Sequence, residues 1–146
     1  MAVKSVKPIP DGYHTVTPFL NVKGCAKLID FLKAAFGAEE VMRMPGPNGT
    51  VMHAEVSIGN SRLMLGEPMQ TGASTSAFYL YVNDVDAMYK RALKAGATSV
   101  RPPIDEFWGD RMGTVSDSFG NSWSIATHKE DPTPEEMAKR MAAMGR

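Results

Sequence analysis

The sequence lacks features that several protein classes require. Its 146 residues include a single cysteine, Cys25, so an internal disulfide is excluded and a reducing compartment is favoured. No apolar run is long enough to span a membrane, and the opening residues do not resemble a signal peptide. The 16 basic and 16 acidic residues are scattered, whereas nucleic acids and anionic membranes require clustered positive charge. We therefore expect a cytoplasmic protein with neither nucleic acid nor membrane as a partner.

An internal repeat is the most informative feature that is present. Each copy contains a strand-like run, a helix-like stretch and a later apolar run, marked by Phe19–Val22, Phe36–Ala38 and Gly59–Ser61, and then by Leu80–Val82, Ala95–Ala97 and Gly120–Ser122. A repeat of about sixty residues is a whole supersecondary module, and two copies tend to pack about a pseudo-twofold axis. We therefore expect one domain whose ligand site lies between the copies.

The first module is expected at about residues 12–68, in the order strand, helix, three strands. Tyr13–Val22 is predicted as a strand; because Pro18 lacks an N–H donor, the strand lies at an edge or turns that position away from a neighbour. Apolar residues at helical spacing follow, from Leu28 to Phe36, and Gly37 is expected to end the helix. Strands are predicted over 39–44, 51–58 and 62–65. Cys25, at the start of the helix, is either a small packed residue or a reactive thiol.

A polar linker is expected at residues 69–76, followed by the second module at about 77–128. Its strands are predicted over 77–82, 98–101, 111–116 and 123–127, with the third element of the module interrupted by Pro102-Pro103. Its helix carries an apolar stripe from Val85, with Asn83 or Asp84 as N-cap and Gly96 as C-cap. Thr133-Pro134-Glu135-Glu136 is a capping box, which predicts a C-terminal helix over about 133–144.

The chain resembles the vicinal oxygen chelate superfamily of glyoxalases, bleomycin-resistance proteins and ring-cleaving dioxygenases, in particular its PhnB-like branch. The resemblance runs from about Gly12 to Glu136 and rests on these segments: Gly12–Pro18, Ala35–Ala38, His53–Glu55, Tyr81–Asp86, Ala95–Ala97, Gly109–Arg111 and Asp117–Gly120. It implies an α+β fold of two βαβββ modules with curved mixed sheets around a cleft. Lyases, dioxygenases, epimerases and drug-binding proteins share this scaffold.

The resemblance also implies where a metal would bind. Metal-dependent members take one ligand from the first strand and one from the last strand of each module. The matching positions here are Thr17, Leu63 or Met64, Ala77 and Ser124. None is His, Asp or Glu, the donors that divalent metals need in such sites. We therefore predict neither a metal nor another cofactor at these positions.

His53 and Glu55 form a separate candidate pair. Two residues apart on a predicted strand, they point to the same face. They are either a general base with its orienting carboxylate, the seed of a metal site of another arrangement, or a hydrogen-bonded pair in the cavity wall. No third donor can be placed beside them from the sequence, because His14, at the start of the first strand, could approach only through the fold, and His128 follows the last strand and is expected to be exposed.

A second group of candidates would bind a ligand. Trp108 and Arg111 lie in one predicted loop, where Arg can fork onto a carboxylate and Trp can stack on a ring. The alternative is that Arg111 pairs with Asp110 while Trp108 covers the core edge. Several residues alternate in phase with the family's ligand positions and should therefore face the same side: Thr17, Phe19, Ala77, Tyr79 and Tyr81 on the first strands, and Ser124 on the last strand. They predict either an aromatic-lined pocket or simple filling of the core.

Three functions compete on these observations. The absent metal ligands and the aromatic positions favour a metal-free protein that binds a small organic molecule. The alternative is a lyase or dioxygenase of the superfamily type that uses His53 and Glu55, with a noncanonical metal or without one. A methyltransferase, a label attached to the PhnB-like branch, is disfavoured because the sequence has no G-x-G. We expect a homodimer, since paired modules of this kind often assemble through sheet edges or exchanged modules.

Overall fold

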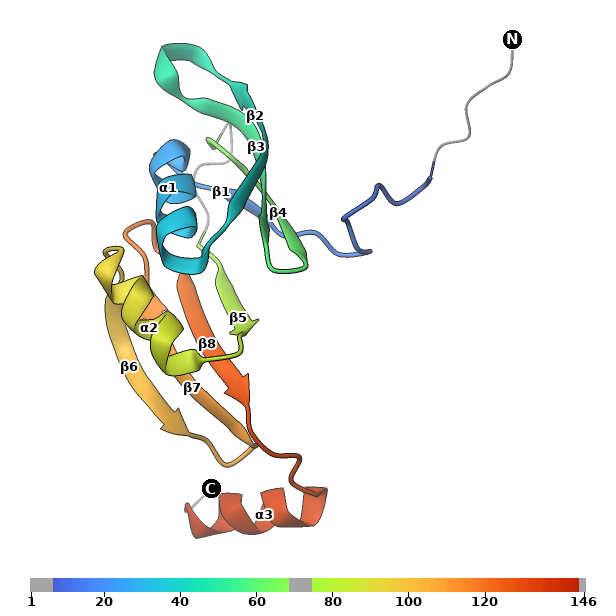
Figure 1. Ribbon diagram of the computed structural model, residues 1–146, viewed down its shortest axis with the longest axis vertical. Coiled ribbons are helices and arrows are strands. Elements are labelled where there is room, and N and C mark those ends of the chain that lie inside the picture. The colour runs from blue at the N-terminus through green and yellow to red at the C-terminus, as the bar shows by residue number, and fades with distance from the viewer. Residues whose placement is uncertain (1–6, 69–74, 145–146) are drawn as a thin grey trace. The chain divides into compact units, whose positions relative to one another are not determined.

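The computed structural model describes residues 7–68 and 75–144, and the chain divides into two compact units between Thr75 and Ser76. Each unit contains a strand, a helix and three further strands in that order (Figure 1). This confirms the predicted α+β class with two βαβββ modules. Of the predicted linker 69–76, residues 69–74 lie outside the described residues.

The sheet of the first unit contains β1 (Phe19–Asn21), β2 (Glu39–Pro45), β3 (Val51–Ile58) and β4 (Ser61–Gly66). The strand order is β1-β4-β3-β2, with β1 parallel to β4 and the other neighbours antiparallel. A short 3-10 turn, η1 (Pro47–Gly49), connects β2 to β3. Strands β1 and β2 are therefore the edges of this sheet, and the edge position of β1 agrees with the prediction from Pro18.

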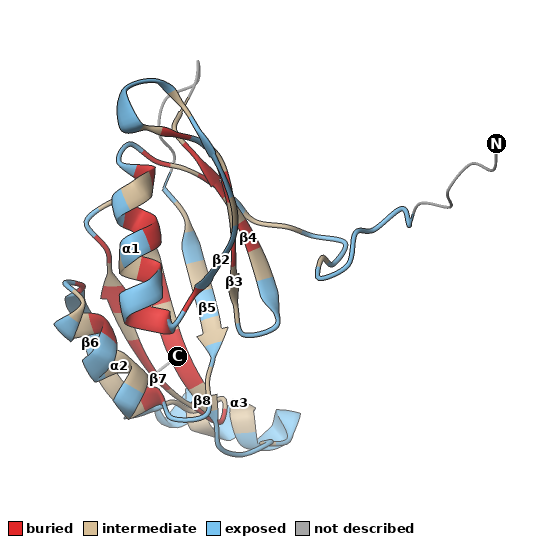
Figure 2. Ribbon diagram, turned by 45° about the horizontal axis from the view of Figure 1, so that its top comes forward, coloured by how far each residue is buried: buried red, intermediate tan, exposed pale blue. Residues whose placement is uncertain are grey.

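Helix α1 (Cys25–Phe36) buries one face, which Leu28, Ile29, Leu32 and Ala35 form at the predicted spacing (Figure 2). Gly37 ends it in the left-handed conformation. No side chain of the helix itself caps the start; instead the Glu67 carboxylate accepts from the backbone N–H groups of Gly24 and Cys25. Burial, with the Glu67 charge beside it, raises the pKa of the Cys25 thiol to about 11. The thiol therefore stays protonated, as expected of a packed residue.

The sheet of the second unit has the matching order β5-β8-β7-β6, formed by β5 (Ala77–Tyr81), β6 (Thr98–Asp105), β7 (Asp110–Ser116) and β8 (Ser122–His128). Helix α2 (Val85–Lys94) packs on one face of this sheet, against β6, β7 and β8. Asp84 is its N-cap, accepting from the Ala87 N–H at 3.1 Å. The helix ends at Lys94, and its C-cap is Ala95, one residue before the predicted Gly96. Fully buried Trp123 and Ile125 form the centre of the core beneath it.

Two strands differ from the prediction in extent. The first strand is only three residues long: residues 13–17 follow an irregular path, and pairing begins with the Pro18 carbonyl, which accepts from the Met64 N–H at 2.9 Å. By contrast, β6 continues through Pro102-Pro103. Its register with β7 skips from Arg101 to Ile104, so both prolines lie in a bulge of an edge strand where no N–H is needed.

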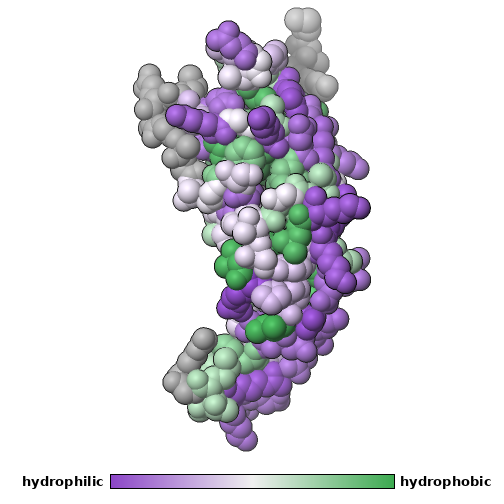
Figure 3. Space-filling model, turned by 90° about the vertical axis from the view of Figure 1, so that its left-hand side faces the viewer, coloured by the Kyte–Doolittle hydropathy of each residue, from purple (hydrophilic) through white to green (hydrophobic). Residues whose placement is uncertain are grey.

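A third helix, α3 (Pro134–Ala143), follows β8 and begins at the predicted capping box, in which Thr133 Oγ1 accepts from the Glu136 N–H at 3.1 Å. The side of the molecule drawn in Figure 3 carries separate apolar patches among hydrophilic residues. None of the helices in the described part of the chain has the length and apolar character that crossing a membrane requires.

Candidate functional site

The open face of the second unit's sheet carries exposed aromatic side chains. Along β5, Phe78 turns to the core and stacks on Trp123 with ring centroids 4.4 Å apart, whereas Tyr79 and Tyr81 turn to the opposite face. Tyr79 is 43% exposed and Tyr81 is 65% exposed. Large aromatic groups left this accessible, while Phe78 and Leu80 beside them are half-buried on the other face, are a candidate binding surface.

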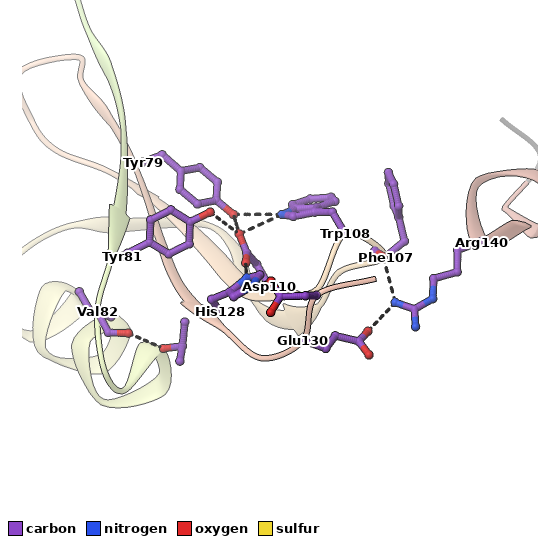
Figure 4. A network of polar contacts seen from close by, with 11 residues as sticks. Tyr79, Tyr81, Val82, Phe107, Trp108, Asp110, His128, Glu130 and Arg140 are labelled. Carbon is purple, nitrogen blue, oxygen red and sulfur yellow. Dashed lines mark hydrogen bonds and ion pairs between the residues drawn. The ribbon is translucent and has the colours of Figure 1, made fainter. Parts of the chain in front are cut away.

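One buried carboxylate holds these side chains in place (Figure 4). Asp110 accepts hydrogen bonds from the Tyr79 hydroxyl at 2.7 Å and the Tyr81 hydroxyl at 3.0 Å. It also accepts from Trp108 Nε1 at 3.1 Å and from His128 Nδ1 at 2.7 Å. We call these five residues the Asp110 cluster. Four elements or connections contribute to it: β5, the β6–β7 loop, β7 and the end of β8.

The charge on Asp110 is stabilised by these donors. Asp110 is only 2% exposed, and burial alone would raise its pKa. The hydrogen bonds from Tyr79, His128, Tyr81 and Trp108 outweigh burial and hold the pKa of the carboxyl below its ordinary value. In turn, burial and the bond to Asp110 raise the pKa of Tyr79, and the bond to Asp110 raises that of Tyr81. At neutral pH the cluster therefore contains a carboxylate and two protonated phenols.

His128 lies between two carboxylates. Its Nδ1 is bonded to Asp110, and its Nε2 is 2.6 Å from Oδ1 of Asp131, which is exposed. Only a doubly protonated imidazole can donate from both nitrogens. The hydrogen bond to Asp110, followed by that to Asp131, accordingly raises the pKa of His128. The imidazolium offsets the buried charge of Asp110.

Gly109 sets the position of the two residues beside it. Its φ is +102°, and a Cβ there would lie 2.2 Å from the Glu130 carbonyl oxygen. The Gly109 carbonyl in turn accepts from the backbone N–H groups of Lys129 and Glu130. Glycine alone fits this close approach, which fixes Trp108 and Asp110 against the end of β8.

Helix α3 supports the same loop. Arg140 Nη1 donates to the Phe107 carbonyl oxygen at 3.0 Å and is also paired with Glu130 (Figure 4). The ring of Phe107 meets that of Trp108 edge to face, with centroids 5.1 Å apart. The predicted C-terminal helix therefore contacts the loop that carries Trp108.

A hollow of about 390 Å³ adjoins the Asp110 cluster, lined by Tyr81, Val82, Asn83, Thr127 and His128. The Tyr81 and His128 rings that border it stand edge to face, with centroids 6.5 Å apart. On the same sheet face, Ser124 pairs in register with Tyr79, and its hydroxyl is 3.0 Å from that of Thr114. The predicted ligand residues Tyr79, Tyr81, Trp108 and Ser124 thus share one surface.

Arg111 does not join this surface. It follows Asp110 on β7, so its side chain turns to the opposite face, where it forks onto Asp86 of α2 at 2.9 and 3.0 Å. It also contacts Asp105 at 3.3 Å. The expected local pair between Asp110 and Arg111 does not form. Arg111 borders a largely acidic hollow of about 640 Å³, whose lining also includes Gly109 and Asp110.

The first unit brings together another set of predicted residues. His53 Nε2 and Glu55 Oε2 are 3.1 Å apart, and the His53 ring lies 5.7 Å from that of Phe19. Glu55 and Thr17 line a hollow of about 490 Å³ with the segment before β1; the hollow is bordered by Pro8, Ile9, Pro10, Tyr13, His14, Thr15, Thr17, Glu55 and Met64. Thr17 precedes β1 instead of lying within it.

The residues at the family's metal positions do not fit a metal ion. In the first unit, Met64 lies beside Phe19 in register while Leu63 is buried, so Met64 occupies the open face with Thr17. In the second unit the positions are Ala77 and Ser124. These side chains offer no imidazole or carboxylate. Within residues 7–68 and 75–144, no three His, Cys, Asp or Glu side chains are grouped so that they could hold a metal ion.

Sequence reasoning missed Asp110 and His128 as members of the cluster. His128 is exposed, as expected, but its bond to Asp110 depends on the β7–β8 register, in which these two residues face each other. Strand alternation places Asp110 on the same sheet face as Met112 and Thr114, and this alternation was the available signal that Asp110 belongs to the site. The register itself is not visible in a single sequence.

Comparison with known proteins agrees with this architecture. Residues 13–125 match the model of the Glyoxalase/Bleomycin resistance protein/Dioxygenase superfamily. An uncharacterized protein of Mycobacterium bovis is 37% identical over 142 residues, covering 89% of this chain and 93% of that protein. The crystal structure of TioX from Micromonospora sp. ML1 has 28% identity and a TM-score of 0.68, over 77% of this chain and 96% of TioX.

A further solved structure is TnmS3, an antibiotic binding protein from Streptomyces sp. CB03234. It has a TM-score of 0.64 at 23% identity, over 88% of this chain and 99% of TnmS3, so the likeness concerns the fold. The repeated βαβββ modules, the family match and the mycobacterial relative together show that the chain belongs to the glyoxalase/bleomycin resistance protein/dioxygenase superfamily.

Proposed function

We propose that this protein binds a small aromatic molecule on the Asp110 cluster, without a metal ion. The observation that carries the proposal is the fixing of three exposed or half-buried aromatic side chains, Tyr79, Tyr81 and Trp108, by one buried carboxylate. The adjoining hollow of about 390 Å³ has room for a small ring system.

Preorganisation is the physical reason to expect binding here. An exposed tyrosine or tryptophan loses rotamer freedom when a ligand immobilises it, and this loss weakens binding. In the Asp110 cluster the hydrogen bonds to the carboxylate have already fixed the rings. Ring stacking and edge-to-face contacts with an aromatic ligand then contribute without that entropic cost. The antibiotic-binding function stated for TnmS3 is consistent with a role of this kind on the same fold.

Tryptophan provides the test. The chain contains two tryptophans, and Trp123 is fully buried on the core side of the sheet, away from the Asp110 cluster. We expect aromatic compounds to shift the indole N–H resonance of Trp108 in protein NMR spectra and to leave that of Trp123 almost unchanged. The Trp108→Phe variant assigns the two resonances. If a broad panel of aromatic compounds shifts neither resonance, or shifts Trp123 alone, the proposal is wrong.

A second candidate function is catalysis through His53 and Glu55, which are 3.1 Å apart beside a hollow in the first unit. A histidine oriented by a carboxylate can act as a general base. This hypothesis predicts that His53→Ala abolishes turnover of a glyoxal adduct, catechol or epoxide while circular dichroism remains native. A wild-type protein inactive on all three substrate classes would contradict it.

We further propose that the protein is a homodimer. Edge strands β2 and β6 carry exposed apolar residues, including Val41, Met44, Val100 and Ile104, which favour association along sheet edges. Light scattering coupled to size exclusion is expected to give twice the mass of the chain. A mass equal to one chain at micromolar concentration would exclude a stable dimer.

A further inference from the structure

The polar hydrogens of the Asp110 cluster are all directed at carboxylates. The hydroxyls of Tyr79 and Tyr81 each donate their only hydrogen to Asp110. Trp108 Nε1 donates to Asp110 and lies 3.2 Å from the Tyr79 oxygen. His128 is bonded to Asp110 through one nitrogen and to Asp131 through the other. No hydrogen-bond donor of these side chains remains for a ligand.

The cluster does keep hydrogen-bond acceptors that a ligand can use. A phenol oxygen that donates its single hydrogen keeps two lone pairs, so it can still accept. The Tyr79 oxygen lies within reach of Trp108 Nε1, whereas the Tyr81 oxygen receives no hydrogen bond from the described residues. Tyr81 is also the more exposed of the two. Among the polar groups of the Asp110 cluster, the one offered most openly to a ligand is therefore the acceptor oxygen of Tyr81.

The protonation states support this assignment of hydrogens. The pKa of Asp110 lies below its ordinary value, and those of Tyr79 and Tyr81 lie above theirs. Around neutral pH the phenols keep their hydrogens, and the carboxylate keeps its capacity to accept them. An outward turn of the Tyr81 hydroxyl would leave a buried carboxylate with one donor fewer, which is costly.

We propose that the site selects aromatic ligands that carry a hydrogen-bond donor, such as a phenol or an aniline, over ligands that carry only acceptors. This selection rests on the proposed binding function and specifies the class of ligand. The ring of the ligand lies against the cluster's aromatic side chains, and the O–H or N–H of the ligand donates to the Tyr81 oxygen. Quinones, ethers and other ligands with acceptors alone would face that oxygen without a partner and would bind more weakly.

A matched pair of probes tests the selection in the wild-type protein. 2-Naphthol and 2-methoxynaphthalene share the ring system and differ in the donor hydrogen. Titrations followed by the Trp108 indole resonance should give 2-naphthol a dissociation constant about three to ten times lower, the range that one net hydrogen bond provides. An apolar surface without this acceptor would favour the ether, because its methyl group adds apolar area.

Each outcome decides a different claim. Equal dissociation constants, or tighter binding of the ether, would overturn the donor preference and leave the binding site intact. Failure of both probes to shift Trp108 at their solubility limit, while both leave the protein folded, would overturn the proposed function and with it the preference.

Variants test the mechanism of selection. In Asp110→Leu the acceptor is gone while the side chain keeps the same branching, so the tyrosine hydroxyls are free to donate outward, and the preference for 2-naphthol should fall to about one. A preference retained in this variant would overturn the proposed mechanism. The Trp123 indole resonance reports whether the variant folds. If the variant does not fold, the comparison of the two probes in the wild-type protein still tests the preference. Tyr89→Phe is the matched control, because Tyr89 is on α2 and bonds Ser99 instead of Asp110; it should retain the full preference.

Discussion

Among the individual residues, Asp110 organises the candidate site. It is nearly inaccessible, and the cost of burying its charge is offset by four donors from Tyr79, Tyr81, Trp108 and His128. The arrangement works in both directions: the donors keep the carboxylate ionised, and the carboxylate keeps the aromatic side chains in place. Removing the acceptor therefore affects both stability and the binding surface.

Asp110→Ala is expected to lower the free energy of unfolding by about 2–3 kcal/mol, because partly buried donors lose their acceptor. Urea denaturation followed by Trp123 fluorescence measures the change. Asp131→Ala is the control, since Asp131 contacts the same histidine from an exposed position and should alter stability little. Equal effects of the two substitutions would show that the donors do not depend on Asp110.

His128 should make stability depend on pH. Its pKa is raised in the folded state, so the stabilisation it provides is complete below its ordinary pKa and is lost as the pH rises through the raised value. The groups facing it are Asp110, whose lowered pKa lies at more acidic pH, the carboxylate of Asp131, and Tyr81, whose raised pKa lies at more alkaline pH. A loss of stability that begins as the pH rises above the ordinary histidine pKa of about 6.5 is thus expected from His128.

The variant His128→Gln isolates this effect. The difference in unfolding free energy between wild type and His128→Gln should be larger at about pH 6 than at about pH 9. Urea titrations of both proteins at the two pH values measure it. A difference that stays constant, or grows toward pH 9, would contradict an imidazolium between the two carboxylates.

At the scale of elements, helices were easier to predict than strands. The apolar spacing from Leu28 to Phe36 and the caps at Asp84 and Thr133 are local signals, and the helices formed where these signals lie. The first strand and β6 were predicted incorrectly in extent because strand pairing is not local. Pro102-Pro103 is compatible with β6 only through a bulge opposite Gly113, and pairing of this kind leaves no trace in a single sequence.

The β6–β7 loop offers a test of how the binding surface is built. Gly109→Ala combines an unfavourable positive φ with a contact to the Glu130 carbonyl, so a loss of about 3 kcal/mol or more in the free energy of unfolding is expected. Gly96→Ala is matched to it, because Gly96 has a φ of +110° but open space around it. It should cost only about 1 kcal/mol. Thermal unfolding of both variants separates the steric contribution from the backbone contribution.

At the scale of the whole molecule, the internal repeat was the decisive signal. It predicted two βαβββ modules because equivalent elements recur in the same order, and both sheets have the equivalent strand order. The composition of the aromatic face was also predictable in part, since Tyr79 and Tyr81 alternate with core residues along β5. The hydrogen bonds that organise this face depend on the register between strands, so they could not be predicted from the sequence.

Metal content is the property of the whole protein that the sequence addresses most directly. Thr17, Met64, Ala77 and Ser124 provide no suitable donors, so we expect protein purified without added metal to contain far less than one equivalent of zinc, nickel, manganese or iron. Elemental analysis measures this. A stoichiometric divalent metal that resists dialysis would refute the expectation and would favour catalysis through His53 and Glu55.

The bond between Arg140 and the Phe107 backbone has a practical consequence for engineering. Helix α3, which follows the last strand, supports the loop that carries Trp108. Shortening the chain before Thr133, or fusing a rigid partner to α3, is therefore expected to alter the affinity for the proposed ligand from a distance. Directed changes in this helix would then tune the proposed recognition without altering any residue of the Asp110 cluster.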